Sequence, residues 1–298
     1  MSRTSYPRIY RELLSSGEPL LMVGVYDGLS ALAAKRAGFA ACSISGAAVA
    51  ASRLGMPDLG LLTFNEILDQ SRAIVRAAQL PIIADVDTGF GGSLNVVRTI
   101  EAFEEIGVAG VHLEDQVFPK KCGHFKDKRV IPTDEMVAKI LAVRHAASDP
   151  DFVLVARTDA RDPEGLDAAI DRSRRYIGAG ADVMFIEAPR DRTELERIAA
   201  ANLGVPLWVN LAEGGNTPMI PPAELAAMGF QIAVYPGAAS KTVAKALVEL
   251  MQGLKDDGDV VRFLPSMMTL PERSALLGLS AYEALDAQLA RDAEAAAP

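Results

Sequence analysis

Eight short runs of apolar residues, rich in valine and isoleucine, recur along this chain and alternate with longer segments of helical periodicity. Runs that are apolar at nearly every position are typical of parallel strands, because parallel sheets are covered on both faces. This regular alternation predicts an α/β protein, specifically a closed (β/α)8 TIM barrel. The expected strands are residues 20–25, 41–45, 81–87, 110–115, 152–159, 182–188, 206–211 and 231–236.

The segments between these runs carry recognisable helix ends. Residues 27–39 begin with Asp27, a good N-cap, and stop at a glycine, while residues 132–146 place acidic side chains in the first turn. Beyond the last run, helical patterns at 241–254 and 271–292 flank a charged break. The chain therefore continues as helices after its barrel.

No change of composition marks a linker, so we expect one barrel domain over residues 1–298. Its C-terminal part, at about 255–292, should form a helical extension, and residues 293–298 should fray. Half of the residues are hydrophobic, which is enough for a large core.

The composition also excludes several classes of partner. A net charge of −9 argues against binding to nucleic acids or anionic membranes. No run approaches the roughly 18 apolar residues of a membrane span, and the start has no secretory signal. Two cysteines, Cys42 and Cys122, form neither a disulfide framework nor a zinc pattern. We expect a cytoplasmic protein that acts on a small molecule.

Polar side chains gather at the C-terminal ends of the expected strands, where barrel enzymes build their active sites. Residues two apart in a strand point to the same face, which pairs Asp85 with Asp87 and His112 with Glu114. Several carboxylates should therefore face one cavity. The polar residues at strand ends are Tyr26, Asp27, Ser43, Ser45, Asp85, Asp87, Glu114, Asp115, Arg157, Asp159, Glu187, Asn210 and Tyr235.

Crowded carboxylates either take up protons or bind a cation. Oxygen ligands favour Mg²⁺ or Mn²⁺ over zinc, so the group Asp85, Asp87 and Glu114 predicts a metal site. The alternative is that some of these acids cap helices or pair with Arg157. Arg157 itself suits a bidentate clamp for a substrate carboxylate, or an ion pair inside the barrel. The segment 213–218, EGGNTP, is either a phosphate-binding loop or an ordinary turn.

Cys122 stands in residues 117–125, VFPKKCGHF, after Lys120 and Lys121 and two residues before His124. Neighbouring cations lower the pKa of a thiol toward the range in which it exchanges protons at neutral pH. The sequence therefore predicts a catalytic acid on a flexible lid, with a solvated basic loop as the alternative. Cys122 and His124 do not suggest a metal site, because they are only two positions apart and the sequence offers no second ligand pair.

Five motifs together resemble the isocitrate lyase/phosphoenolpyruvate mutase superfamily over about residues 10–290. The resemblance implies a Mg²⁺-dependent barrel that makes or breaks bonds next to an α-keto acid. It also implies a homotetramer in which a helix beyond the barrel, here 271–292, is swapped between subunits. The motifs are KKCGH (120–124), ADVDTGFG (84–91), HLEDQVFP (112–119), VARTDAR (155–161) and SRLGMPDLG (52–60).

The resemblance implies roles for individual residues. Asp85 and Asp87 match the Mg²⁺ ligands, with Glu114 and Asp58 acting through bound water. Cys122 matches the catalytic cysteine of the lyase branch. The other residues expected in catalysis are Lys120, His124 and Glu114. Substrate contacts are expected from Ser45, Gly46, Ala47, Tyr26, Gly123, Arg157, Glu187, Asn210, Glu213 and Pro236.

The Cys-Gly-His loop indicates the lyase branch, because cleavage of a carbon–carbon bond leaves an enediolate that must be protonated, whereas phosphoryl migration needs no carbon acid. Methylisocitrate lyases carry arginines where this chain has Lys241 and Leu270, and a tyrosine where it has Ser43. The chain instead resembles the petal-death-protein and 2,3-dimethylmalate-lyase group. Pro236 replaces the serine of oxaloacetate hydrolases.

We therefore expect a carbon–carbon lyase that cleaves a 2-alkylmalate or methylisocitrate to pyruvate and a carboxylic acid, with Cys122 as proton donor and the lysines stabilising negative charge. Mg²⁺ is the expected cofactor and Mn²⁺ its substitute. The acceptor of the C2 hydroxyl proton stays open among Tyr26, Lys120 and a metal-linked carboxylate. Alternatives are an oxaloacetate hydrolase or decarboxylase, a carboxyvinyl-carboxyphosphonate or phosphoenolpyruvate phosphonomutase, a phosphate-binding aldolase and a non-catalytic barrel.

Overall fold

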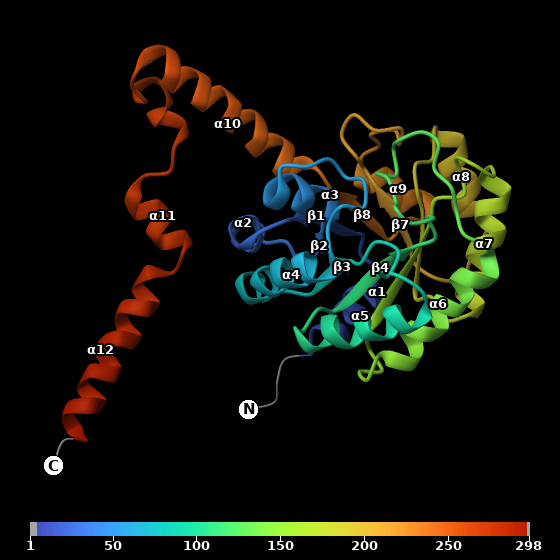
Figure 1. Ribbon diagram of the computed structural model, residues 1–298, viewed down its shortest axis with the longest axis horizontal. Coiled ribbons are helices and arrows are strands. Elements are labelled where there is room, and N and C mark those ends of the chain that lie inside the picture. The colour runs from blue at the N-terminus through green and yellow to red at the C-terminus, as the bar shows by residue number, and fades with distance from the viewer. Residues whose placement is uncertain (1–4, 297–298) are drawn as a thin grey trace. The chain divides into compact units, whose positions relative to one another are not determined.

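The computed structural model describes residues 5–296 and contains the expected closed barrel (Figure 1). Each strand pairs in parallel with its neighbours in sequence order, and β1 closes the ring on β8. The predicted fold class is confirmed. The strands are β1 (Leu20–Val25), β2 (Cys42–Ile44), β3 (Ile82–Asp85), β4 (Gly110–Glu114), β5 (Val153–Thr158), β6 (Val183–Ile186), β7 (Leu207–Asn210) and β8 (Ile232–Tyr235).

Helices cover the outside of this barrel (Figure 1). Asp27 caps the second of them as predicted, accepting the backbone N–H of Ser30 at 2.7 Å, and that helix ends at Gly38, whose φ is 87°. A short π-helix, Ala50–Leu54, follows the third. The helices are α1 (Tyr6–Ser15), α2 (Gly28–Ala37), α3 (Gly46–Val49), α4 (Phe64–Ala78), α5 (Ser93–Glu105), α6 (Thr133–Ala146), α7 (Leu166–Gly178), α8 (Arg192–Ala200) and α9 (Pro222–Met228).

One strand end departs from the prediction in a way that matters for the site. β3 stops at Asp85 and not at Asp87, because Asp87 adopts a left-handed φ of 47° and begins the loop toward α5. Asp85 and Asp87 therefore do not share a strand face. Their carboxylates are instead brought together by a turn.

Two apolar layers hold the barrel. The outer layer lies between strands and helices, and the inner layer fills the barrel with side chains such as Met22, Ile83 and Phe185. Tyr10 of α1 is fully buried against this inner layer, with its hydroxyl 3.5 Å from the sulfur of Met22. Because the interior is packed, the space for a ligand lies where the polar strand ends gather.

The chain divides into two compact units, Met1–Lys241 and Thr242–Pro298. The second contains most of α10 (Ala238–Asp257), a 3₁₀ helix (Val261–Ser266), α11 (Leu270–Leu276) and α12 (Leu279–Ala295).

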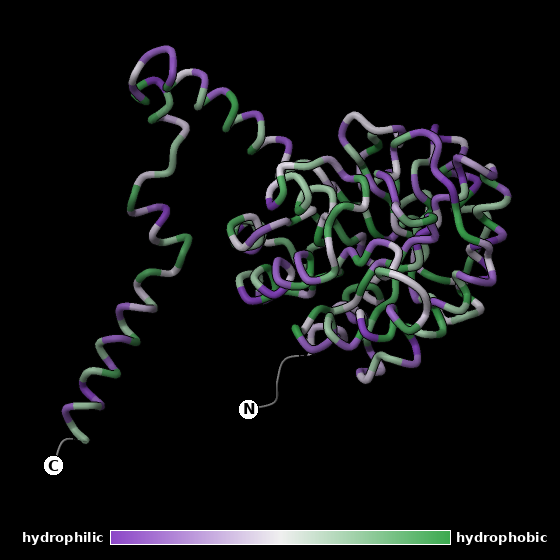
Figure 2. Tube along the Cα trace, in the orientation of Figure 1, coloured by the Kyte–Doolittle hydropathy of each residue, from purple (hydrophilic) through white to green (hydrophobic). Residues whose placement is uncertain are grey.

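The segment 271–292, expected as one helical piece, forms two helices because Gly278 interrupts it with a φ of 73°. Residues 293–295, expected to fray, continue α12, and residues 297–298 lie outside the described part. Figure 2 shows apolar residues recurring among polar ones along these helices. Among residues 5–296, the helices lack the length or the apolar content to cross a membrane.

Candidate active site

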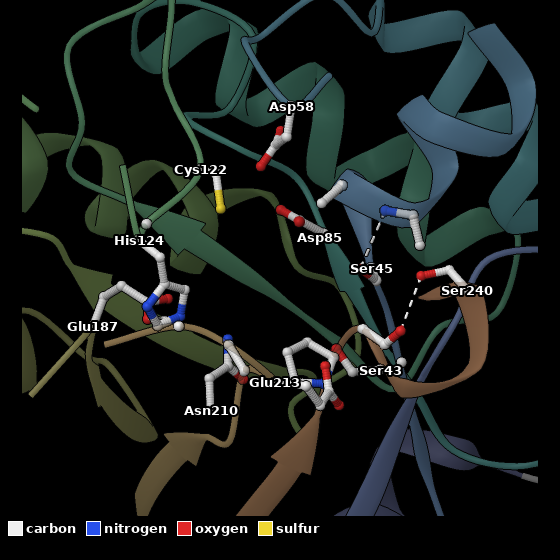
Figure 3. Close-up of a pocket in the computed structure, with 18 of the residues that line it drawn as sticks. Ser43, Ser45, Asp58, Asp85, Cys122, His124, Glu187, Asn210, Glu213 and Ser240 are labelled. Carbon is white, nitrogen blue, oxygen red and sulfur yellow. Dashed lines mark hydrogen bonds and ion pairs between the residues drawn. The ribbon is translucent and has the colours of Figure 1, made fainter. Parts of the chain in front are cut away.

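A cavity of about 400 Å³ opens where the C-terminal strand ends meet their loops (Figure 3). Most of the predicted site residues line it, although they are scattered over nearly 200 positions of the sequence. The predicted residues in its wall are Ser45, Ala47, Asp58, Asp85, Lys120, Cys122, Gly123, His124, Arg157, Glu187, Asn210, Glu213 and Pro236.

Four predicted residues are not part of the cavity wall. Gly46 donates its N–H to Asp85 Oδ2 at 3.1 Å, while Asp87 and Glu114 contact wall residues through ion pairs. Tyr26 belongs to the apolar core. Gly46, Asp87 and Glu114 thus hold wall residues in place through a hydrogen bond or an ion pair. Tyr26 contributes to packing in the core.

The ammonium of Lys120 joins two carboxylates of the predicted metal group. Lys120 Nζ lies 2.9 Å from Asp87 Oδ1 and also donates to Asp58. Burial lowers the pKa of Lys120, but Asp87 and Asp58 outweigh burial and raise that pKa well above its ordinary value. Lys120 therefore carries a fixed positive charge.

Asp85 and Asp87 have pKa values shifted in opposite directions. Burial raises the pKa of both groups, but for Asp85 the charges of His112 and Lys120 outweigh it and the pKa is lowered. For Asp87, burial and the Asp85 carboxylate outweigh Lys120 and raise the pKa to about 6. His112 Nε2 lies 3.6 Å from Asp85 Oδ1, and burial lowers the pKa of this imidazole.

Arg157, on β5, is the centre of a second charged group. Its guanidinium donates to both carboxylate oxygens of Asp159, at 2.8 and 3.0 Å. It also lies 3.3 Å from Glu114 Oε2 and 3.2 Å from Glu187 Oε2. Burial lowers the pKa of Arg157, but these three carboxylates raise it well above its ordinary value. Arg157 thus forms ion pairs inside the barrel and also lines the cavity.

The oxygens of Asp85, Asp87 and Glu114 suit a hard divalent cation. Burial raises the pKa of Glu114 well above its ordinary value despite Arg157, and its Oε1 is buried without a hydrogen-bond partner. Such an oxygen is costly unless a proton or a cation meets it. Within residues 5–296, no three His, Cys, Asp or Glu side chains could hold a metal by themselves. Other ligands would be water or substrate.

Cys122 lies on the loop between β4 and α6, residues 115–132, called the cysteine loop below, and its thiol points into the cavity (Figure 3). The prediction of a lowered thiol pKa is wrong. Burial raises the pKa of the thiol, and a hydrogen bond from the His124 backbone opposes this only in part. Lys120 is engaged by carboxylates, and Lys121 donates to the carbonyl of Asp127 at 3.4 Å. The thiol therefore stays protonated at neutral pH.

His124 packs on residues 213–218, the loop after β7. Its Nδ1 accepts the backbone N–H of Asn216 at 3.0 Å, and its Nε2 lies 3.3 Å from Glu187 Oε1 without a hydrogen bond. Burial lowers the pKa of His124, so the neutral ring can accept at Nδ1. The backbone N–H of Asn216 is therefore used to hold the cysteine loop and is not free to bind a phosphate.

Comparison with known proteins decides the family. The family described as phosphoenolpyruvate phosphomutase matches residues 10–255. The chain is 44% identical to a 2,3-dimethylmalate lyase of Eubacterium barkeri, over 90% of this chain and 93% of the relative. It is 45% identical to a 2-methylisocitrate lyase of Bacillus subtilis (strain 168), over 95% and 92%. The chain belongs to the phosphoenolpyruvate mutase/isocitrate lyase superfamily.

Solved structures of this superfamily share the whole fold. An oxaloacetate acetylhydrolase with the inhibitor 3,3-difluorooxalacetate has a TM-score of 0.92 at 36% identity, over 96% of this chain and 97% of that one. A 2,3-dimethylmalate lyase has a TM-score of 0.91 at 38% identity, over 97% and 96%. A phosphonopyruvate hydrolase with oxalate and Mg²⁺ has a TM-score of 0.86 at 28% identity, over 95% and 99%.

In this superfamily member, several side chains of the cavity were missed or misread in the sequence. Trp208 and His112 were not among the predicted site residues, yet both line the cavity, and Trp208 donates to Asn210 Oδ1 at 2.9 Å. Each precedes a predicted site residue by two positions in its strand, a spacing that could have placed it. Ser240, in α10, also lines the cavity, and no motif singled it out.

Proposed function

We propose that this protein is a metal-dependent carbon–carbon lyase that cleaves a 2-hydroxy dicarboxylate to pyruvate and a second carboxylic acid. The observation that carries this proposal is the position of the Cys122 thiol, which faces a cavity walled by carboxylates, Lys120 and Arg157, and burial raises the pKa of this thiol. A thiol of this kind can deliver a proton to carbon, which lyase chemistry requires and phosphoryl transfer does not. The two lyases of 44% and 45% identity support the reaction class.

Mg²⁺ is the proposed cofactor, with Mn²⁺ as a chemically similar substitute. Asp85 and Asp87 would hold the ion, with Glu114 and Asp58 acting through water. When bound, the ion supplies Lewis-acid polarisation of the substrate's C2 oxygen and its neighbouring carboxylate. The Mg²⁺ named for the phosphonopyruvate hydrolase supports an ion of this kind.

The charged side chains of this chain then have separate roles. Arg157 offers a fixed cation to orient a substrate carboxylate, while Ser45 and Ala47 line the same cavity. Lys120 stabilises negative charge and cannot act as the base, because its raised pKa keeps it protonated. Tyr26 is a poor candidate for the base because it lies in the apolar core and not in the cavity wall. A carboxylate is therefore the favoured acceptor of the C2 hydroxyl proton.

Bond cleavage between C2 and C3 leaves pyruvate and a carboxylate enediolate centred on C3. The Cys122 thiol gives its proton to C3, forming the new C–H bond and a thiolate. His124 and Gly123 line the cavity beside the thiol. A closed loop at this place would exclude water, which would otherwise compete for the enediolate. The thiolate regains the proton that the base took from the C2 hydroxyl, directly or through water, and this closes the proton balance.

The cavity favours a dicarboxylate over a tricarboxylate. A third carboxylate needs another cation, and Lys241, at the edge of the cavity, would have to leave Glu213 Oε2, which lies 3.2 Å from its ammonium. Pro236 lines the wall and has no hydroxyl to bind the hydrated ketone of oxaloacetate. These contacts favour a 2-alkylmalate such as 2,3-dimethylmalate.

Pyruvate release in the presence of Mg²⁺, coupled to lactate dehydrogenase, tests the proposal with 2,3-dimethylmalate, 2-methylmalate and methylisocitrate. Isocitrate is tested by glyoxylate release. We expect turnover of an alkylmalate that a chelator abolishes and that Cys122→Ala lowers about 10²–10⁴-fold. Cys42→Ala, at a cysteine buried in the core, is the matched control and should keep its activity. The absence of both pyruvate and glyoxylate from the whole panel contradicts the lyase, and oxalate release from oxaloacetate would support the hydrolase alternative.

We also propose that the protein assembles with further copies of itself, as a homotetramer in which the C-terminal helices pack on neighbouring subunits. The supporting observation is the apolar surface of the unit Thr242–Pro298. Large apolar side chains there are unusually exposed, with Val248 at 70%, Leu270 at 74% and Tyr282 at 71%. Many large apolar side chains exposed on one unit are typical of protein interfaces.

A further inference from the structure

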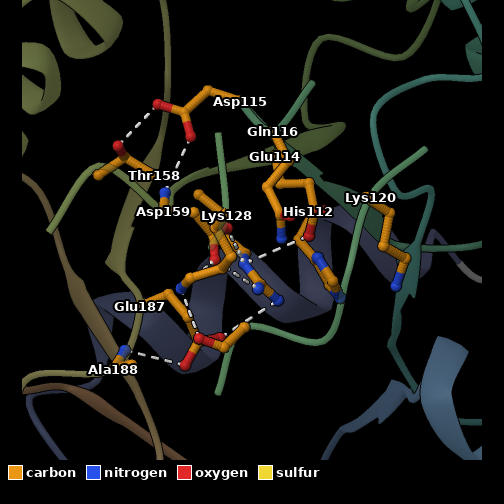
Figure 4. Close-up of polar contacts among 12 residues, drawn as sticks. His112, Glu114, Asp115, Gln116, Lys120, Lys128, Thr158, Asp159, Glu187 and Ala188 are labelled. Atoms are coloured by element: carbon orange, nitrogen blue, oxygen red, sulfur yellow. Dashed lines mark hydrogen bonds and ion pairs between the residues drawn. The ribbon is translucent and has the colours of Figure 1, made fainter. Parts of the chain in front are cut away.

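Lys128 is a buried lysine of the cysteine loop that the mechanism above does not use. Its side chain is 1% exposed, and its ammonium lies 2.9 Å from Asp159 Oδ1 (Figure 4). The same ammonium donates to the backbone carbonyl of Gly123. Lysines are almost never fully buried unless they are paired, so a buried lysine at this position indicates a structural role for its ion pair.

Asp159 links that lysine to the substrate-binding wall. It follows β5 directly and is fully buried. Its two oxygens accept from Arg157 at 2.8 and 3.0 Å, and one of them also accepts from Lys128. One buried carboxylate therefore fixes both the arginine of the cavity and the lysine of the loop.

Gly123, the residue held by Lys128, stands between Cys122 and His124. A side-chain carbon at Gly123 would collide with Arg157 and Glu187, so the loop tip lies directly against the cavity wall. The loop tip has other contacts too, among them the Cys122 N–H to the carbonyl of Asp58 at 3.1 Å, Asn216 to His124, and His124 Nε2 at 3.3 Å from Glu187 Oε1. The Lys128 contact differs from these because it ends on a fully buried carboxylate that also holds Arg157.

We propose that Lys128 and Asp159 form a clasp that holds the cysteine loop closed and fixes the position of the Cys122 thiol. Both are positioning residues that act through Gly123 and Arg157. The link to catalysis rests on the proposed lyase function, whereas the clasp itself is a property of the folded loop. Removing the ammonium should release the thiol and leave Asp159 paired with Arg157.

The test uses Lys128→Met, which keeps the apolar stem of the side chain and removes only its charge. The two cysteines report on it separately, because Cys122 is on the loop and Cys42 is buried in the core. Labelling with iodoacetamide, read residue by residue by mass spectrometry, should be at least about tenfold faster at Cys122 than in the native protein. Cys42 should stay unlabelled.

Kinetics of the same variant give a second readout. With an alkylmalate, kcat should fall about 10–100-fold while KM changes little, because the loop is misplaced but Arg157 keeps its partner. Lys128→Arg, which keeps the charge, should restore slow labelling and most of kcat. Lys126→Met, an exposed lysine of the same loop, is the matched control and should behave as the native protein does.

The outcomes separate the clasp from the proposed function. Unchanged labelling of Cys122 in Lys128→Met overturns the clasp whatever the substrate is. Labelling of Cys42 together with Cys122 also overturns it, because the lysine would then stabilise the whole fold. Faster labelling of Cys122 alone supports the clasp, and if the native protein turns over no substrate, the failure belongs to the proposed function.

Discussion

At the scale of single residues, the cysteine loop depends on a glycine beside its thiol. Gly123 has no left-handed φ, so its backbone would accept other residues. The constraint is space, since a side-chain carbon would meet the Arg157 guanidinium and the Glu187 side chain. Neither neighbour can move freely, because Arg157 is held by Asp159 and Glu187 forms an ion pair with Arg157.

Gly123→Ala should therefore lower kcat/KM by about 100-fold, because the loop tip must lift away from the cavity wall. The thermal midpoint should change by less than about 3 °C, since the site lies on a loop. Gly92→Ala is the matched control, because nothing lies within 4 Å of its added carbon. Activity of Gly123→Ala equal to that of Gly92→Ala would contradict the packing argument.

The sequence allowed many site residues to be predicted, because strand ends of a barrel converge whatever their distance in the chain. It could not give the charge state of Cys122. Adjacent lysines suggested a lowered pKa, but their ammonium groups point to other partners and burial dominates. The pair Lys128–Asp159 was equally invisible, since 31 positions separate its members and neither forms a local motif with the other.

At the scale of elements, strand and helix types followed from apolar runs and caps, whereas the junctions between elements depend on buried polar contacts. Asp115, just after β4, shows why. Its carboxylate accepts from Thr158 at 2.7 Å, from Tyr176 of α7 at 2.8 Å and from the N–H of Asp159 at 2.8 Å. Such a hub joins two strand ends and a helix, and hydropathy patterns do not reveal it.

Burial, reinforced by Asp159, raises the pKa of Asp115 from 3.8 to about 6. The folded state then holds a proton that the unfolded state has released, so the stability from this group is full below about pH 4 and is lost as pH rises through about 6. The two pKa values differ by an amount equivalent to about 3 kcal/mol. Asp115→Asn should remove this term.

Urea unfolding at pH 4 and pH 7 measures that effect. The change in unfolding free energy between the two pH values should differ by about 2 kcal/mol between Asp115→Asn and the native protein, because at pH 4 the unfolded state is still partly ionised. Asp171→Asn, at an exposed aspartate of α7, should retain the native pH dependence. If both variants show the native pH dependence, Asp115 does not carry the proton assigned to it.

At the scale of the whole molecule, the barrel has a core of its own, whereas the helices of Thr242–Pro298 bury few of their apolar residues. On α12, Leu279, Tyr282, Leu285 and Leu289 recur at helical spacing and are 46–71% exposed. A full burial of one such leucine contributes about 1.5–3 kcal/mol. Packing between copies of the chain would recover this free energy.

The double variant Leu285→Asp with Leu289→Asp places two charges on that apolar face and should reduce the assembly to smaller species. The native protein should elute with the mass of a tetramer in size-exclusion chromatography with light scattering. Ser280→Asp with Ala287→Asp adds the same charge to the opposite side of α12 and should leave the mass unchanged. A native protein that runs as a monomer would contradict the assembly. An unchanged mass in the leucine variant would instead show that the interface lies on other elements. An interface that buried Leu285 and Leu289 would not tolerate two aspartates without partners.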